Sequence, residues 1–88
     1  HLVLGFVKEK DLVSIFEILP KKAIYYFSAP NIKRAEEVSA LIKHAENYKL
    51  QATAYKTIDI AYKSALKSAG AEDFIYVGGS TFVVAEIL

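Results

Sequence analysis

The sequence predicts an α/β domain of the Rossmann-like, three-layer class with a mostly parallel sheet. Along its 88 residues, short continuous apolar runs alternate with segments whose apolar residues recur at helical spacing. Strands that alternate with helices in this way form parallel sheets through right-handed crossovers. Hydrophobic residues make up 53% of the chain and charged residues 24%, a balance typical of a core-forming domain and unlike a disordered segment. We therefore expect one domain over residues 1–88.

The first third of the chain predicts a strand, a helix and a second strand. The run 2–7 is short, continuous and apolar, as in a strand that is covered on both faces. A helix is predicted over 11–19, because Asp11 is a favourable N-cap and Pro20 stops the helical spacing. The aromatic-rich run 23–27 predicts the next strand.

A long amphipathic helix is expected next, after the turn-rich segment 28–31. It begins at Arg34 and keeps its apolar residues on one face as far as Tyr48. The short run 53–55 is a weaker strand prediction and suits the edge of a sheet.

The last third predicts a helix, a strand and a closing helix. Thr57 is a favourable cap for a helix that Gly70 ends, and 73–77 reads as the last strand. The pair Gly78-Gly79 breaks the apolar run, and Ser80 or Thr81 then provides a cap for a short buried helix.

Ligands of parallel sheets bind beyond the carboxyl ends of the strands. The loops expected there are 8–11, 28–34, 56–57 and 78–81; three of them carry Lys or Arg, and the fourth carries two glycines and two hydroxyl residues. Together they suit a carboxylate or a phosphate. Alternative interpretations are solvated lysines at Lys8 and Lys10, a surface ion pair of Arg34, and a plain turn at 78–81.

Composition and motifs exclude several other functions. A net charge of +1 is too small to attract nucleic acid or an acidic membrane surface by long-range electrostatics. No apolar run reaches the roughly 18 residues that a membrane span needs. Cysteine is absent, and His1 and His44 lie too far apart for a metal motif. Neither GxxxxGK nor GxGxxG occurs, and no nucleophile, base and orienting group are recognisable. We expect a cytoplasmic protein, and the missing initiator Met indicates a piece of a larger one.

Four stretches together resemble one known family. They are HLVLGFVKEKDL, the YYF strand with PNIKRA, TIDIAYKSAL, and DFIYVGGSTFVVAEIL. The chain resembles, over nearly its whole length, the C-terminal domain of folylpolyglutamate synthase/dihydrofolate synthase, in the Mur ligase superfamily. The resemblance implies ATP-dependent ligation, in which an acyl phosphate of the substrate carboxylate reacts with the amino group of L-glutamate. The implied ligands are ATP, Mg²⁺, folate or dihydropteroate, and L-glutamate.

The resemblance also suggests roles for individual residues. Lys10, Ser80 and Thr81 fall where related ligases hold the carboxylates of the incoming amino acid, as charge and hydrogen-bond partners and not as proton-transfer catalysts. Arg34 and Gly79 are possible ligand-edge residues, and the role of Arg34 is not assigned.

The departures from the family pattern are equally informative. The phosphate loop and metal ligands of the family belong to an ATPase domain that precedes this region, and its DGAHN segment, with the first strand and helix, has no counterpart here. We therefore expect the fragment alone to be inactive, to bind neither ATP nor Mg²⁺, and to self-associate as a homodimer. A non-catalytic α/β module that binds a small anion, a nucleotide or a protein partner is the alternative. A flavodoxin-like or receiver-like domain is disfavoured, because lysines replace the acidic cluster expected after the first strand.

Overall fold

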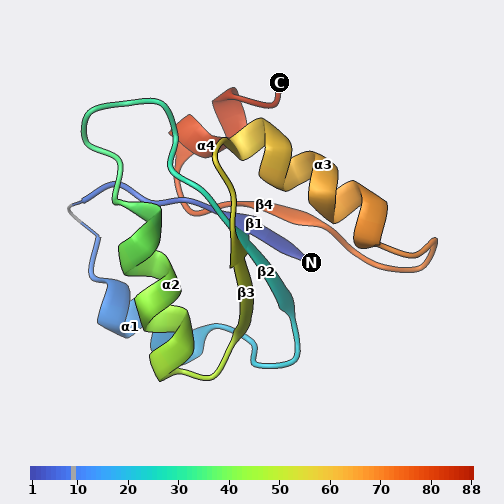
Figure 1. Ribbon diagram of the computed structural model, residues 1–88, viewed down its shortest axis with the longest axis horizontal. Coiled ribbons are helices and arrows are strands. Elements are labelled where there is room, and N and C mark those ends of the chain that lie inside the picture. The colour runs from blue at the N-terminus through green and yellow to red at the C-terminus, as the bar shows by residue number, and fades with distance from the viewer. Residues whose placement is uncertain (9) are drawn as a thin grey trace.

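The computed structural model describes every residue except Glu9. Strands and helices alternate along the chain: β1 (Leu2–Leu4), α1 (Leu12–Ile18), β2 (Ile24–Phe27), α2 (Val38–Asn47), β3 (Gln51–Ala54), α3 (Ile58–Ser68), β4 (Tyr76–Gly78) and α4 (Thr81–Ala85). The strands form one four-stranded sheet in the order β3-β2-β1-β4, and each neighbouring pair is parallel (Figure 1). This arrangement confirms the predicted α/β class.

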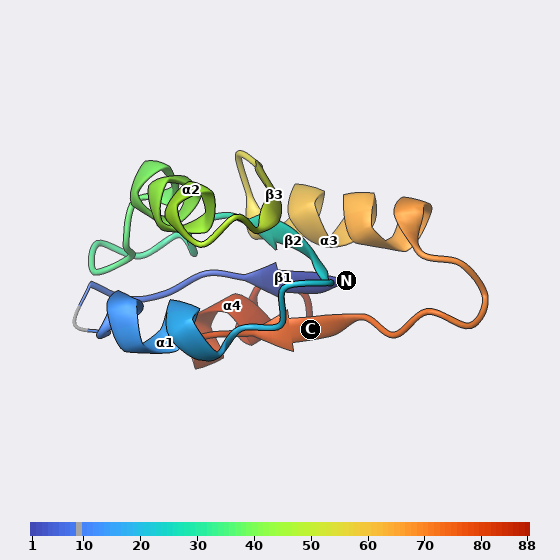
Figure 2. The same ribbon diagram turned by 90° about the horizontal axis from the view of Figure 1, so that it is seen from below.

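Helices cover both faces of the sheet, and α3 lies apart from α1 and α2 (Figure 2). Successive residues of β1 serve opposite faces, because side chains alternate along a strand. Leu4 packs into the cluster formed with α1 and α2, whereas Val3 packs with Ala61 and Ala65 of α3. The result is the predicted three-layer architecture.

Phe16 of α1 occupies the centre of the larger cluster. Its side chain is almost fully buried, and its ring contacts those of Phe6, Phe27, His44 and Tyr48 at centroid distances of 5.3 to 6.5 Å. One aromatic side chain therefore links α1 to α2, to β2 and to the segment after β1. His44 is half-buried in this packing.

The first strand forms where it was predicted, but its predicted end at Val7 and the predicted start of the long helix at Arg34 are both wrong. β1 ends at Leu4, and α2 begins only at Val38. The amide of Lys8 donates to the carbonyl of Arg34, and the amide of Glu36 donates to the carbonyl of Phe6, both with N···O distances of 2.7 Å. This short antiparallel pairing uses backbone groups that a continued helix would need for itself.

The final segment differs from its predictions in detail. β4 starts at Tyr76, because the preceding residues form a turn in which the Asp73 carboxylate accepts the amide of Gly70 at 2.7 Å. α4 forms where a helix was predicted, but within it only Val83 is buried. No helix among the described residues combines the length and apolarity needed to cross a bilayer.

Candidate functional site

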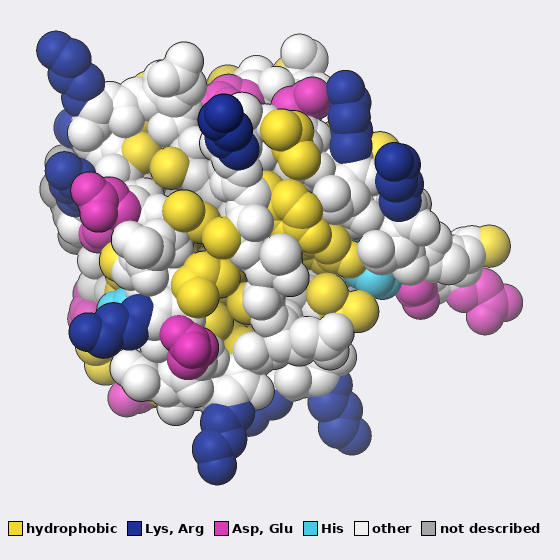
Figure 3. Space-filling model, viewed as in Figure 1, with side chains coloured by type: hydrophobic (Ala, Val, Ile, Leu, Met, Phe, Trp, Pro, Cys, Tyr) yellow, Lys and Arg dark blue, Asp and Glu magenta, His cyan; other side chains and the backbone are white. Residues whose placement is uncertain are grey.

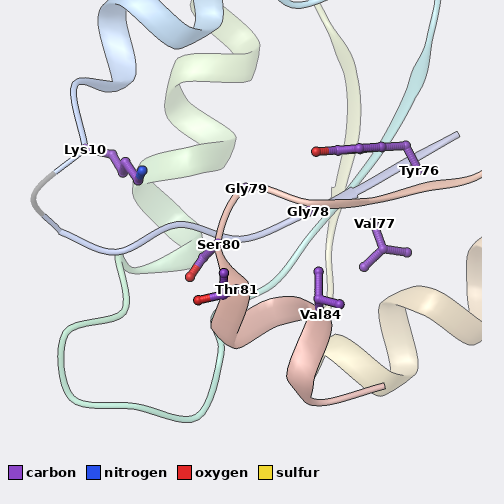
Figure 4. Close-up of a pocket in the computed structure, with 8 residues that line it drawn as sticks. All are labelled: Lys10, Tyr76, Val77, Gly78, Gly79, Ser80, Thr81 and Val84. Atoms are coloured by element: carbon purple, nitrogen blue, oxygen red, sulfur yellow. The ribbon is translucent and has the colours of Figure 1, made fainter. Parts of the chain in front are cut away.

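The ends of β1 and β4 bring Lys10 together with the Gly78–Thr81 segment. They line one open pocket of about 440 Å³, which Tyr76, Val77 and Val84 complete. In Figure 4 Lys10 lies on one side of this pocket and Tyr76 and Val77 on the opposite side, with Ser80, Thr81 and Val84 between them. The structure thus gathers four of the five predicted site residues, Lys10, Gly79, Ser80 and Thr81, at the carboxyl edge of the sheet.

Gly79 builds the turn that presents Ser80. Its φ of +89° lies in the left-handed region, which side-chain-bearing residues rarely adopt. A β-carbon at this position would also lie 2.5 Å from the carbonyl oxygen of Gly5 and 2.9 Å from the ring of Phe6. Packing against the end of β1 therefore explains why this residue is glycine, without any need for a ligand to approach it.

Ser80 caps α4, and its hydroxyl keeps a further hydrogen-bonding capacity. Its Oγ accepts the amide of Phe82 at 3.2 Å, which is the N-cap interaction predicted from the sequence. A hydroxyl that accepts one hydrogen bond can still donate its own proton. Ser80 can therefore donate to a carboxylate in the pocket while it holds the helix start in place.

Lys10 provides the positive charge of the pocket. Its side chain is exposed, and no described residue forms an ion pair with it. The neighbouring Asp11 is engaged elsewhere: its carboxylate accepts the hydroxyl of Ser14 at 2.7 Å and the Ser14 amide at 3.3 Å. Both hydrogen bonds lower the pKa of Asp11, and the one from the Ser14 side chain has the larger effect. The ammonium group thus remains available to an anionic ligand.

Arg34 lies next to the pocket and does not line it. Its guanidinium carbon is 5.9 Å from the centre of the Phe82 ring on α4, within the range of a cation–π contact. Its carbonyl meanwhile pairs with the Lys8 amide. The structure therefore places the Arg34 guanidinium against the ring of Phe82, the neighbour of Thr81 in sequence, and leaves Arg34 outside the residues that line the pocket.

The loops after β2 and β3 form a separate hollow. Lys56 and Thr57 line it with residues 29–31 and Glu86, and its volume is about 530 Å³. The Glu86 carboxylate also accepts the amide of Asn31, which ties the end of α4 to the loop after β2. The single anion-binding edge expected from the sequence is thus divided between two pockets.

The sequence analysis missed Tyr76, Val77 and Val84 as pocket residues. They looked like ordinary core positions of a strand and a helix, and only the location of β4 at the sheet edge exposes them. A run of apolar residues carries no signal for that location.

The described residues contain no group of three or more His, Cys, Asp or Glu side chains that would suit a metal ion. The sequence contains no GxxxxGK loop either.

Comparison with known proteins adds independent information. No family model matches the chain. A dihydrofolate synthase/folylpolyglutamate synthase of Buchnera aphidicola (subsp. Acyrthosiphon pisum, strain APS) is 33% identical over 91 aligned residues, which span 100% of this chain and 21% of that protein. The chain is homologous over its full length to dihydrofolate synthase/folylpolyglutamate synthase.

Solved structures of this synthase share the fold. E. coli FolC in complex with DHPP and ADP superimposes with a TM-score of 0.78 at 22% identity, over 98% of this chain and 20% of that one. E. coli FolC in complex with ADP, without folate substrate, gives the same values. The chain therefore spans about one fifth of the length of the synthases that it matches, and the resemblance predicted from its motifs is confirmed as homology to this synthase.

Proposed function

We propose that this chain is the C-terminal, Mur ligase-like domain of an ATP-dependent ligase that adds L-glutamate to folate or dihydropteroate. The full-length homology to dihydrofolate synthase/folylpolyglutamate synthase supports this assignment. The observation that carries the role of the domain is the meeting of Lys10 with Ser80 and Thr81 in one pocket at the carboxyl edge of the sheet.

In this proposal the domain holds the incoming glutamate. The Lys10 ammonium attracts one carboxylate, and the hydroxyl groups of Ser80 and Thr81 donate to it. Held in this way, the amino group of glutamate attacks the acyl carbon of the activated substrate, phosphate leaves, and a proton is lost from nitrogen. Residues outside this chain bind ATP and Mg²⁺ and activate the substrate, so the 88 residues alone are inactive. We also propose that the parent enzyme is located in the cytoplasm.

The test is Ser80→Ala in the full-length protein that contains this chain. Loss of a hydrogen bond to a charged group weakens binding by about 1.5 kcal/mol or more, so KM for glutamate is expected to rise about tenfold. KM for ATP is expected to stay nearly unchanged. Glutamate saturation identical to that of the unmodified enzyme would contradict the proposal and leave residues 78–81 as a turn that starts α4.

Two further variants separate binding from helix capping. Ser80→Asp keeps a capping oxygen but places a negative charge beside the bound carboxylate, so it is expected to impair glutamate binding more than Ser80→Ala does. Thr57→Ala removes the equivalent cap of α3, where the hydroxyl accepts the amide of Ile60 at 3.1 Å. Because Thr57 lies in the other pocket, this variant is expected to lower stability without changing KM for glutamate.

The non-catalytic binding module remains the alternative, and the same protein distinguishes it. A full-length protein that shows no ATP-dependent ligation of glutamate would favour the module. Ligation by the isolated 88 residues would contradict the assignment of ATP and Mg²⁺ to residues outside this chain.

A further inference from the structure

Tyr76 lines the pocket on the side opposite Lys10, and its hydroxyl points across the pocket toward the side of that lysine (Figure 4). The residue is 49% exposed, so its hydroxyl is open to a molecule in the pocket. The hydroxyls of Tyr25 and Tyr26 both have hydrogen-bond partners within the chain. The Tyr76 hydroxyl has no such partner among the residues that the structure describes. It therefore keeps its hydrogen-bonding capacity for a ligand.

Gly78 makes room for the Tyr76 ring. The two residues lie on the same face of β4, because side chains alternate along a strand. A β-carbon at Gly78 would lie 2.7 Å from two ring carbons of Tyr76 and closer still to its hydroxyl oxygen. The backbone does not itself demand glycine there, since the φ of Gly78, unlike that of Gly79, is not positive. Glycine inside a strand weakens it and often marks a position that a ligand approaches closely, so its presence favours a binding role for the ring above it.

The hydrogen-bond donors of the pocket lie in two places. Lys10, Ser80 and Thr81 provide the first group, and the Tyr76 hydroxyl is a separate, neutral donor. Because this hydroxyl lies over position 78, two residues before Ser80, the chain between them spans at most roughly 7 Å. A ligand with one carboxylate can use only the first group, whereas a short dicarboxylate can reach both.

We propose that Tyr76 is a specificity-determining residue of this pocket, whose hydroxyl donates a hydrogen bond to the second carboxylate of a dicarboxylic ligand. This inference rests on the proposed function, in which Lys10, Ser80 and Thr81 hold the first carboxylate of glutamate. The amino group, carried on the carbon chain between the two carboxylates, is engaged by neither set of donors and stays free to react. An amino acid without a second carboxylate leaves the Tyr76 donor unused, so the pocket selects against it.

Competition with glutamate by two simple acids, in the full-length protein that contains this chain, tests the role of Tyr76. Glutarate carries two carboxylates at the spacing found in glutamate, and butyrate carries one. Tyr76→Phe keeps the ring and removes the hydroxyl. It is expected to raise Ki for glutarate and KM for glutamate about tenfold, because a hydrogen bond to a charged group is lost, and to leave Ki for butyrate unchanged.

Tyr62→Phe is the matched control. Tyr62 packs against the smaller core cluster on the α3 side of the sheet and does not line the pocket. This variant is expected to change none of the three constants. Glutarate that competes no better than butyrate in the unmodified enzyme, or a glutarate Ki that Tyr76→Phe leaves unchanged, would overturn the inference.

General attraction of anions to surface charge is a separate effect. On the face of the molecule that Figure 3 shows, Lys and Arg side chains are spread around the rim, and such charges attract a dianion more strongly than a monoanion. Tyr76→Phe alters no charge, so the rise in Ki for glutarate reports the hydroxyl alone. The rise is expected to persist at raised ionic strength, where exposed charges are screened.

Gly78→Ala displaces the Tyr76 hydroxyl instead of removing it. This variant is expected to raise Ki for glutarate, and to add little when combined with Tyr76→Phe, because the hydroxyl that it displaces is then already absent. Circular dichroism verifies that each variant folds. Fully additive effects would contradict the placement of the hydroxyl over Gly78.

Ser80→Ala separates this inference from the proposed function. It removes a donor to the first carboxylate, so it is expected to raise Ki for glutarate and for butyrate alike. If Ser80→Ala has this effect and Tyr76→Phe has none, the role of Tyr76 is overturned and the proposed function stands. If neither variant changes either Ki, both are overturned.

Discussion

Gly79 packs directly against the carbonyl oxygen of Gly5, so that the chain leaving β4 touches the chain leaving β1. The two strands are already paired, Leu4 opposite Gly78, and the contact continues their association one residue further. It fixes the distance between the segment that carries Lys10 and the turn that carries Ser80. The geometry of the proposed glutamate site thus depends on two positions without side chains.

Gly79→Ala is expected to destabilise the protein by about 2 kcal/mol or more, because the methyl group adds a collision to an unfavourable φ. Urea unfolding monitored by circular dichroism measures the change. Gly70→Ala is the control, since a β-carbon there meets nothing nearer than 3.5 Å. Equal stability of the two variants would show that the Gly5–Gly79 contact is not tight.

Phe16→Ala is expected to cost about 3–5 kcal/mol, because it leaves a cavity between α1, α2 and the sheet. A domain of this size has a small reserve of stability, so the variant is expected to be largely unfolded at room temperature. Thermal unfolding with Ile18→Ala as the comparison checks this, because Ile18 on the same helix is 82% exposed and its loss is expected to change little. A folded, cooperative Phe16→Ala would argue against its central place in the core.

The cap of α1 is expected to depend on pH. The pKa of Asp11 is lowered by its hydrogen bonds from Ser14, so the folded state binds this proton less readily than the unfolded state does. The stabilisation is fully present above the ordinary value of 3.8 and is lost as pH falls through the lowered pKa. Unfolding free energies of the unmodified protein and Asp11→Ala are therefore expected to differ at neutral pH and to converge in acid. Asp11→Asn keeps a capping oxygen that does not titrate, and its advantage over Asp11→Ala is expected to persist in acid.

Tyr25→Phe tests a partly buried hydrogen bond just after α1 and its pH dependence. The Tyr25 hydroxyl donates to the Pro20 carbonyl at 2.5 Å, and its removal is expected to cost about 1 kcal/mol near neutral pH. Burial raises the pKa of Tyr25 above its ordinary value of 10.0, so the folded state resists an ionisation that the unfolded state undergoes. The unmodified protein is therefore expected to lose its advantage over Tyr25→Phe above pH 10.0. An advantage that grew with rising pH would contradict this account.

Features that depend on neighbours in sequence were predictable. Asp11, Thr57 and Ser80 cap the helices that follow them, because a capping side chain reaches an amide only two or three residues ahead. The alternation of helix and strand was predictable from the spacing of apolar residues. Because that alternation implies a parallel sheet, the rule that ligands bind at the loops of the carboxyl edge could be applied. That rule selected the loops 8–11 and 78–81, and the family resemblance then singled out Lys10 and Ser80 within them.

Features that depend on distant pairing were not predictable. The helical spacing around Arg34 suited a helix, but hydrogen bonds to the segment after β1 delay its start to Val38. The separation of Lys56 from Lys10 follows from a sheet order in which β3 and β4 lie at opposite edges. Local patterns carry no information on that order, and so the two pockets appeared as one.

The position of β1 between β2 and β4 has a consequence for how the chain folds. Its first neighbour follows shortly in sequence, but the second comes from the far end, where the amino group of His1 bonds to the carbonyl of Phe74, 73 residues away. Closing so long a loop costs conformational entropy before the contacts between β1 and β4 can stabilise the fold. We therefore expect β4 to pair with β1 late and to limit the folding rate. During that interval β1 has an unpaired side, and the nascent domain is most open to mispairing at the same strand that later supports its site.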